Sequence, residues 1–272
     1  MEETVVGVAA LVYGLGAVIL ALTHLRGEER ASPAIWWLVL GGFLAQGWSL
    51  WGRVVGQHGS WSMDLAGSLE LVSWMMGLLF LLGWRIRRRE TRSVGLLFLP
   101  GMTGMLLLSL LLPEHAPLLG TSMAPMLLGH LGFSLAAYGL FTVAAGLALM
   151  EWIQERALRE KRFSPFLSVL PPLGTLEAIM FGMVRWGFVL LTMSILTGAG
   201  FSYQRTGALF HLTHKEVFSW GTWLLFAGLL AGHHVWGWRG RRAVGLTWTG
   251  YLFLALAYLG VKFVSEVILR KN

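Results

Sequence analysis

The chain has 272 residues, of which 56% are hydrophobic and only 13% are charged. Soluble domains are typically about one-quarter charged, so this composition excludes a soluble globular protein and implies that most helical faces meet lipid or other helices. The net charge of +7 does not indicate nucleic-acid binding, which needs a basic face on a folded domain, and the absence of cysteine excludes disulfides and thiolate metal sites.

Eight apolar segments follow one another along the chain, and each is long enough to cross the hydrocarbon core as a helix. They lie near residues 4–24, 34–54, 64–84, 93–112, 123–150, 176–199, 215–235 and 245–268. We therefore predict an all-α membrane protein with about eight transmembrane helices in a single membrane domain, residues 1–272. The first segment has no basic residues before it, so we expect a retained helix and not a cleaved signal peptide.

The connections between these segments differ in charge and in length. Most Lys and Arg residues follow the first, third, fifth and seventh segments, with runs at 85–92, 156–162 and 239–242. Basic residues are retained on the cytoplasmic side, so we expect both termini outside. The inner connection 151–175 should continue the fifth helix with an i,i+4 pair, Glu155–Arg159, until Pro171 and Pro172 break it. The outer connection 199–214 is the other long one, and we expect a loop there.

Four charged residues within the predicted spans are expected to be paired. Arg185 lies near the middle of the sixth span, and Glu70 lies about six residues into the third. An unpaired guanidinium facing lipid costs several kcal/mol, so we predict that Arg185 is buried within the bundle beside a carboxylate. Glu70 is the first choice of partner, Glu177 the second, and a ligand propionate is a further alternative. Lys262 and Glu266 are one turn apart and should form a structural pair.

Two histidines are the main candidates for chemistry. His130 opens the fifth span and His214 closes the outer connection before the seventh, at the same expected depth. Two imidazoles at facing helix ends can ligate haem iron, and Trp220, Trp223 and Phe210 could line an apolar slot for the macrocycle. The alternative is structural, because histidines and tryptophans also favour membrane interfaces and helix packing.

The second half of the chain carries four motifs in order. They comprise His130 with Ser134 and Tyr138; Gly187, Phe188, Leu191, Thr192, Ile195 and Gly198, with Glu177 upstream; Lys215, Glu216, Trp223, Phe226 and Ala227; and Tyr258, Gly260 and Val261. In these residues and intervals the chain resembles the cytochrome c assembly proteins of the CcsA/CcmC type, and most closely the shorter HemX/YpjD-type members. The resemblance covers about 123–268 and implies a four-span core there, preceded by a variable four-span part at 1–122.

The resemblance also implies ligand residues. An earlier helix of the family bears a haem-ligand histidine, and His130 occupies that position. The family's haem-docking loop keeps only Gly207 here, and its tryptophans and aspartate are replaced by Thr206, Phe210, Leu212 and Thr213. The last helix has Leu269 where the family has a second histidine. His214 replaces a proline of the docking loop and is therefore the expected substitute ligand of the haem iron.

We therefore expect a multi-pass protein of the cell (inner or plasma) membrane. It would handle haem b in cytochrome c biogenesis or haem homeostasis, by binding and transfer and not as an enzyme, with other cytochrome c assembly proteins as partners. HemX-like members imply an alternative, a membrane regulator of a tetrapyrrole-synthesis enzyme that is contacted by residues 151–175. A small-molecule or ion transporter is a third alternative, for which the chain shows no evident internal repeat.

Overall fold

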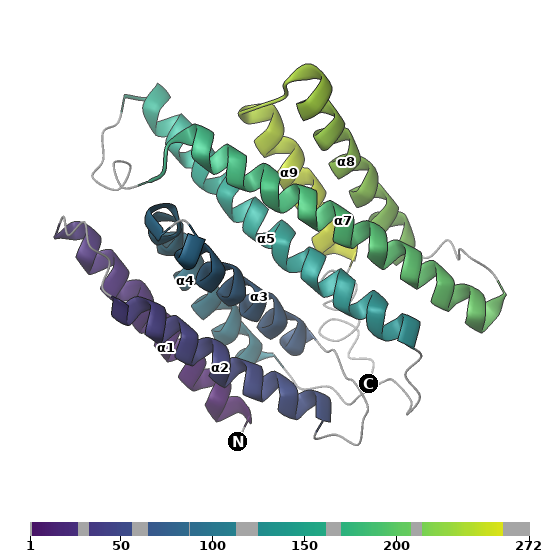
Figure 1. The fold of residues 1–272 in the computed structure, drawn as a ribbon, viewed down its shortest axis with the longest axis horizontal. Helices are drawn as coiled ribbons and strands as arrows, with labels where there is room; N and C mark the ends of the chain where they lie inside the picture. The colour runs from purple at the N-terminus through teal and green to yellow at the C-terminus, as the bar shows by residue number, and fades with distance from the viewer. Residues whose placement is uncertain are drawn as a thin grey trace. The chain divides into compact units, whose positions relative to one another are not determined.

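A computed structural model describes residues 2–26, 33–55, 65–86, 88–112, 125–161, 170–207 and 214–257. Within these ranges the chain forms eight α-helices, which Figure 1 draws in order from purple to yellow. They are α1 (Glu2–Leu25), α2 (Pro33–Val55), α3 (Leu65–Ile86), α4 (Arg88–Leu111), α5 (Pro125–Arg159), α7 (Leu173–Thr206), α8 (His214–Trp236) and α9 (Arg241–Ala255). The prediction of an all-α protein is confirmed.

Several of these helices are long and apolar enough to cross a membrane. Among the described residues, five segments meet that description by length and composition: Glu3–Leu25, Leu65–Ile86, Glu90–Leu111, Gly129–Arg159 and Leu173–Thr206. The chain is therefore a multi-pass membrane protein. The count of about eight spans and the sides of the two termini stay predictions.

The ends of the two longest helices follow from local sequence. α5 continues to Arg159, and Arg159 forms the predicted i,i+4 ion pair with Glu155. The helix ends at Arg159, although we expected it to continue to Pro171 and Pro172, which lie directly before the start of α7. α7 then continues to Thr206, so much of the connection that we expected to be a loop is helix. It ends where the Gly207 N–H donates to the Tyr203 carbonyl at 2.9 Å with a φ of +74° at Gly207, the usual role of a glycine after a helix.

The helices pack as two compact units, which we describe separately. Helices α1 to α4, together with the end of α5 from Gln154, form unit 1. The rest of α5, with α7, α8 and α9, forms unit 2. These two units are not the predicted parts of the sequence, which were a variable part at residues 1–122 and a family-like core at 123–268. That division of the sequence stays a prediction.

The interior of unit 1 is organised around Tyr13 of α1, which is fully buried. Its ring packs against Gly42 of α2, where a Cβ would lie only 2.7 Å from the Tyr13 Cε1. Its hydroxyl donates to Gln46 Oε1 at 3.1 Å, and Gln46 Nε2 donates to the Glu70 carbonyl of α3 at 2.6 Å. One polar chain therefore links three helices, each donor facing an acceptor within the bundle.

The interior of unit 2 contains two stacked rings between two glycines. Phe141 of α5 and Phe226 of α8 stack with centroids 4.0 Å apart and an interplanar angle of 6°. A Cβ at Gly187 of α7 would lie 2.9 Å from Phe141, and a Cβ at Gly250 of α9 would lie 2.8 Å from Phe226. Gly187 therefore leaves room for the Phe141 ring and Gly250 for the Phe226 ring, so that the four helices of this unit meet at one aromatic pair.

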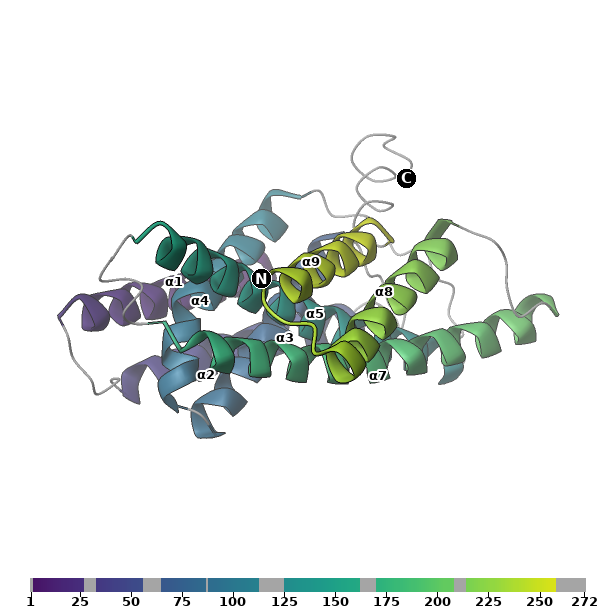
Figure 2. The same ribbon diagram turned by 90° about the horizontal axis from the view of Figure 1, so that it is seen from above.

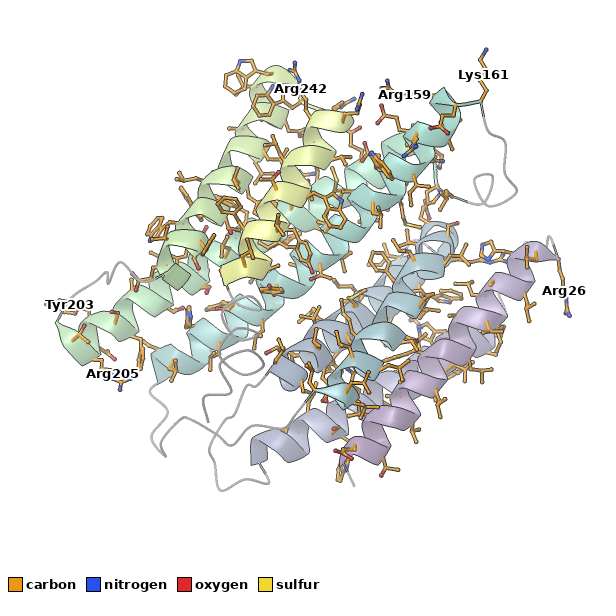
Figure 3. All side chains as sticks on the ribbon, turned by 180° about the vertical axis from the view of Figure 1, so that it is seen from behind. Arg26, Arg159, Lys161, Tyr203, Arg205 and Arg242 are labelled. Carbon is orange, nitrogen blue, oxygen red and sulfur yellow. The ribbon has the colours of Figure 1, made fainter. Side chains whose placement is uncertain are left out.

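The last two helices of unit 2 form a hairpin. α8 and α9 lie side by side, as Figures 1 and 2 both show. The turn between them is made possible by two glycines with positive φ, Gly237 at +64° and Gly240 at +55°. Figure 3 shows Arg242 at this end of unit 2 and Tyr203 with Arg205 at the opposite end, where α7 finishes. Basic residues thus occur at both ends of the unit.

Candidate functional site

His130 is held by α7 through one of its two ring nitrogens. It lies near the start of α5, half-buried, and its Nδ1 is 2.8 Å from the carbonyl oxygen of Ser194 and 3.2 Å from the Ser194 Oγ. A carbonyl oxygen can only accept, so Nδ1 carries the proton, and we infer from this hydrogen bond that the neutral ring has its lone pair on Nε2. A metal-binding histidine usually has this arrangement.

Hydroxyl groups extend the contact between α5 and α7. Ser134 Oγ donates to the His130 carbonyl at 2.6 Å and lies 2.6 Å from Ser194 Oγ. Ser134 is one of the residues that follow His130 in the motif, and it therefore joins the histidine's own backbone to the helix that holds its ring. The motif residue has a structural role here that its spacing alone did not reveal.

Gly198 supplies the space in which the His130 ring lies. A Cβ at this position would lie 2.8 Å from His130 Nδ1 and 3.0 Å from its Cε1, closer than real Cβ atoms approach other atoms. Gly198 closes the motif stretch 187–198, and Ser194 lies one turn before it. Sequence reasoning gave neither residue a role at the site, although Gly198 was part of the motif.

The tryptophans of α8 contact the same stretch of α7 on another face. Trp223 Nε1 donates to Thr192 Oγ1 at 3.0 Å, and the Trp223 ring is tilted against Phe188 at 5.3 Å. Trp220 meets Trp223 edge to face at 6.1 Å and is 37% exposed. Thr192 is about 120° around the helix from Gly198 at 3.6 residues per turn, so the Trp223 contact and the His130 contact lie on different faces of α7.

Two predicted site residues have no described side chain. Phe210 lies outside the described residues, and His214 is described only as the first residue of α8. The start of α5, the end of α7 and the start of α8 lie at the same end of unit 2 (Figure 1). Ligation of one iron by His130 and His214 stays a prediction.

Arg185 lies on an exposed face of α7 within unit 2. Its side chain is exposed, next to exposed Trp186, and its Nε donates to the Phe181 carbonyl of its own helix at 3.2 Å. Within unit 2, α7 turns its Val184 and Gly187 face inward and presents Arg185 on another face. The burial of Arg185 beside a carboxylate stays a prediction. The carboxylate of Glu177, our second choice, is instead 3.5 Å from Arg239 Nε.

Glu70, the first choice of partner for Arg185, belongs to unit 1. Its side chain is buried, with 1% of its surface exposed. Its pairing with Arg185 stays a prediction. The pair Lys262–Glu266 lies outside the described residues.

Comparison with known proteins identifies the family of the chain. The family described as "Cytochrome C assembly protein" matches residues 35–269. The chain belongs to the cytochrome c assembly protein family. The match begins within α2 and therefore includes the third and fourth helices, a wider range than the 123–268 that carried the resemblance.

Three relatives illustrate the range of this family. A 28.8 kDa protein of Azospirillum brasilense is 39% identical over 140 residues, 52% of each chain, so the present chain spans about half the length of that relative. The inner membrane protein YpjD of Escherichia coli K12 is 34% identical over 184 residues, 65% of this chain and 68% of its own. The cytochrome c biogenesis protein CcsA of Gloeobacter violaceus is 33% identical over 92 residues, 34% of this chain and 27% of its own.

Proposed function

We propose that this protein handles haem in cytochrome c biogenesis or haem homeostasis, as a binding and transfer component and not as an enzyme. The family supports a membrane role in cytochrome c assembly. The observation that carries the proposal is the state of His130, whose Nδ1 is engaged by Ser194 while Nε2 keeps its lone pair. An imidazole fixed in this way can serve as an axial ligand of iron.

We place the proposed haem at the end of unit 2 where α5 and α8 begin. His130 would hold the iron, His214 is the proposed second ligand, and Phe210, Trp220 and Trp223 are the proposed walls. Trp223 already has its N–H paired with Thr192, so its ring faces can meet an apolar ligand without leaving a polar atom unsatisfied. The haem, proposed as haem b, supplies a redox-active iron when bound. The protein contributes ligands, orientation and exclusion of water.

The location and partners belong to the same proposal. One relative is named an inner membrane protein and another a cytochrome c biogenesis protein. We place this chain in the cell (inner or plasma) membrane, with other cytochrome c assembly proteins as partners. On the proposed topology, with both termini outside, His130 and His214 lie at the outer face of the membrane.

One observation favours a second candidate, a membrane regulator of a tetrapyrrole-synthesis enzyme. The end of α5 carries two i,i+4 ion pairs, Arg156–Glu160 and Arg159–Glu155, in which both arginines and Glu160 are exposed and Glu155 is half-buried. Figure 3 shows Arg159 and Lys161 projecting at this end. Surface pairs of this kind add little stability, and the exposed charged side chains are accessible to a soluble enzyme.

The test of haem handling is spectroscopic. Protein purified from haem-replete cells should show a Soret band and the spectrum of a low-spin iron, and His130→Ala should remove or convert it. The matched control is His24→Ala in unit 1, because His24 also has its Nδ1 at a backbone carbonyl, 2.7 Å from Leu20 O, and it should leave the spectrum unchanged. A colourless wild-type protein would favour the regulator.

A further inference from the structure

We propose that Ser194 and Gly198 of α7 are positioning residues for His130. They fix the neutral imidazole as the Nδ1–H tautomer and make Nε2 the atom available for coordination. The ligand in this inference rests on the proposed function, whereas the tautomer and the packing are properties of the chain without haem. A test can therefore separate the two.

The tautomer follows from the chemistry of the acceptor. The Ser194 carbonyl oxygen lies 2.8 Å from His130 Nδ1. If the ring proton were on Nε2, two lone pairs would face each other across that distance. With the proton on Nδ1, the contact is a hydrogen bond of ordinary length, and the carbonyl selects this state.

The neighbouring hydroxyls agree with the same assignment. Ser134 gives its proton to the His130 carbonyl, so its oxygen must accept from Ser194 across their 2.6 Å contact. Ser194 then has a lone pair, and no proton, for Nδ1 at 3.2 Å. Each donor in this closed set is used once, and the set accommodates only a protonated Nδ1.

Because residue 198 is a glycine and has no side chain, the His130 ring has room to keep this arrangement. A methyl group on residue 198 would meet both Nδ1 and Cε1 of His130, at 2.8 and 3.0 Å. The ring cannot move away without lengthening its bond to the Ser194 carbonyl. Gly182 of the same helix has nothing within 4 Å of its Cβ position, so an alanine there meets no neighbour. Gly182→Ala is therefore a matched control for Gly198→Ala.

The first experiment uses haem-free protein in detergent or lipid. Nitrogen-15 NMR of histidine-labelled wild type, with the His130 signal assigned by its loss in His130→Gln, should show a protonated Nδ1 and an unprotonated Nε2 at a pH where the ring is neutral. A His130 signal with the proton on Nε2 overturns the proposal. This measurement does not depend on haem binding or on a variant that folds poorly.

The second experiment titrates ferric protoporphyrin IX into the purified protein. Loss of the group that orients a ligand typically lowers affinity 10–100-fold, so Gly198→Ala should weaken binding about that much and alter the low-spin electron paramagnetic resonance signal. Gly182→Ala should match wild type. Ser194→Ala should shift the signal, and Ser194→Thr, which keeps the hydroxyl, should restore it.

The outcomes separate the inference from the proposed function. Equal affinity and equal spectra for Gly198→Ala and Gly182→Ala overturn the positioning role even if haem binds. A wild-type protein that binds no haem overturns the proposed function, while the NMR result still decides the tautomer.

Discussion

Trp223 shows how an aromatic residue brings a polar atom into a helical bundle. Its N–H donates to the Thr192 hydroxyl at 3.0 Å, and that hydroxyl donates to the Phe188 carbonyl at 2.8 Å. Every proton in this pair of contacts therefore has an acceptor. A partly buried donor that loses its partner costs about 1–3 kcal/mol, more than the bond itself contributes.

We predict that Thr192→Val lowers the free energy of unfolding by about 1–3 kcal/mol, because valine keeps the shape of the side chain and removes the acceptor. Denaturant titration of the protein in detergent, followed by tryptophan fluorescence, measures the change. Thr197→Val is the control, since among the described residues Thr197 Oγ1 bonds to the Met193 and Ser194 carbonyls of its own helix. Equal midpoints for the two variants would show that the Thr192–Trp223 bond does not stabilise the bundle.

The candidate site shows which residues a sequence can identify. His130 was predicted as a ligand because it starts a helix and matches a motif. Its contacts with Ser194 and Gly198 join residues more than sixty positions apart, and such tertiary contacts leave no mark in local periodicity. The depth of Arg185 in its helix was likewise readable from the sequence, but the face of α7 that turns toward the interior of unit 2 is set by packing.

At the scale of helices, the apolar segments predicted the elements well and their ends less well. α5 ends at Arg159 and not at Pro171, although its continuation through the charged i,i+4 pairs was predicted. The end of α7 was not, because the polar residues after residue 199 suggested a loop. The chain from residue 199 to Thr206 contains no proline, so nothing breaks the helix until Gly207. Gly207 was noted as a remnant of a motif, and its role as a helix stop was missed.

The stacked rings of unit 2 give a prediction at this scale. Phe226→Ala should lower the free energy of unfolding by about 3–5 kcal/mol, because it leaves a void beside Phe141 where four helices meet. Leu224→Ala on the same helix is the control, since Leu224 is 62% exposed and should cost far less. Unfolding of both variants in mixed micelles, followed by circular dichroism, provides the comparison. A Phe226→Ala variant as stable as the control would mean that the stack does not hold the unit together.

At the scale of the whole chain, composition and the length of apolar runs were enough to predict a helical membrane protein. Five described helices satisfy the requirements of a membrane span. The described helices α2, α8 and α9 are not among these five. The orientation depends on the distribution of Lys and Arg, which is a signal about insertion and not about packing.

We predict that both termini are extracytoplasmic. Fusing alkaline phosphatase, which is active only outside, and a fluorescent protein, which is active only inside, should report the cytoplasm after residue 90 and the exterior at the C-terminus. The basic run at 85–92 is the reason for the first assignment. A cytoplasmic C-terminus would show that the number of spans is odd.

The pair of rings between Gly187 and Gly250 constrains how this chain can diverge. A lineage that acquires a side chain at 187 must at the same time reduce the volume at 141, since a Cβ there would lie 2.9 Å from the Phe141 ring. The same holds for 250 and 226, and the two substitutions are coupled through the stack of Phe141 on Phe226. Among relatives that keep this packing, positions 141, 187, 226 and 250 should therefore change together or stay as they are.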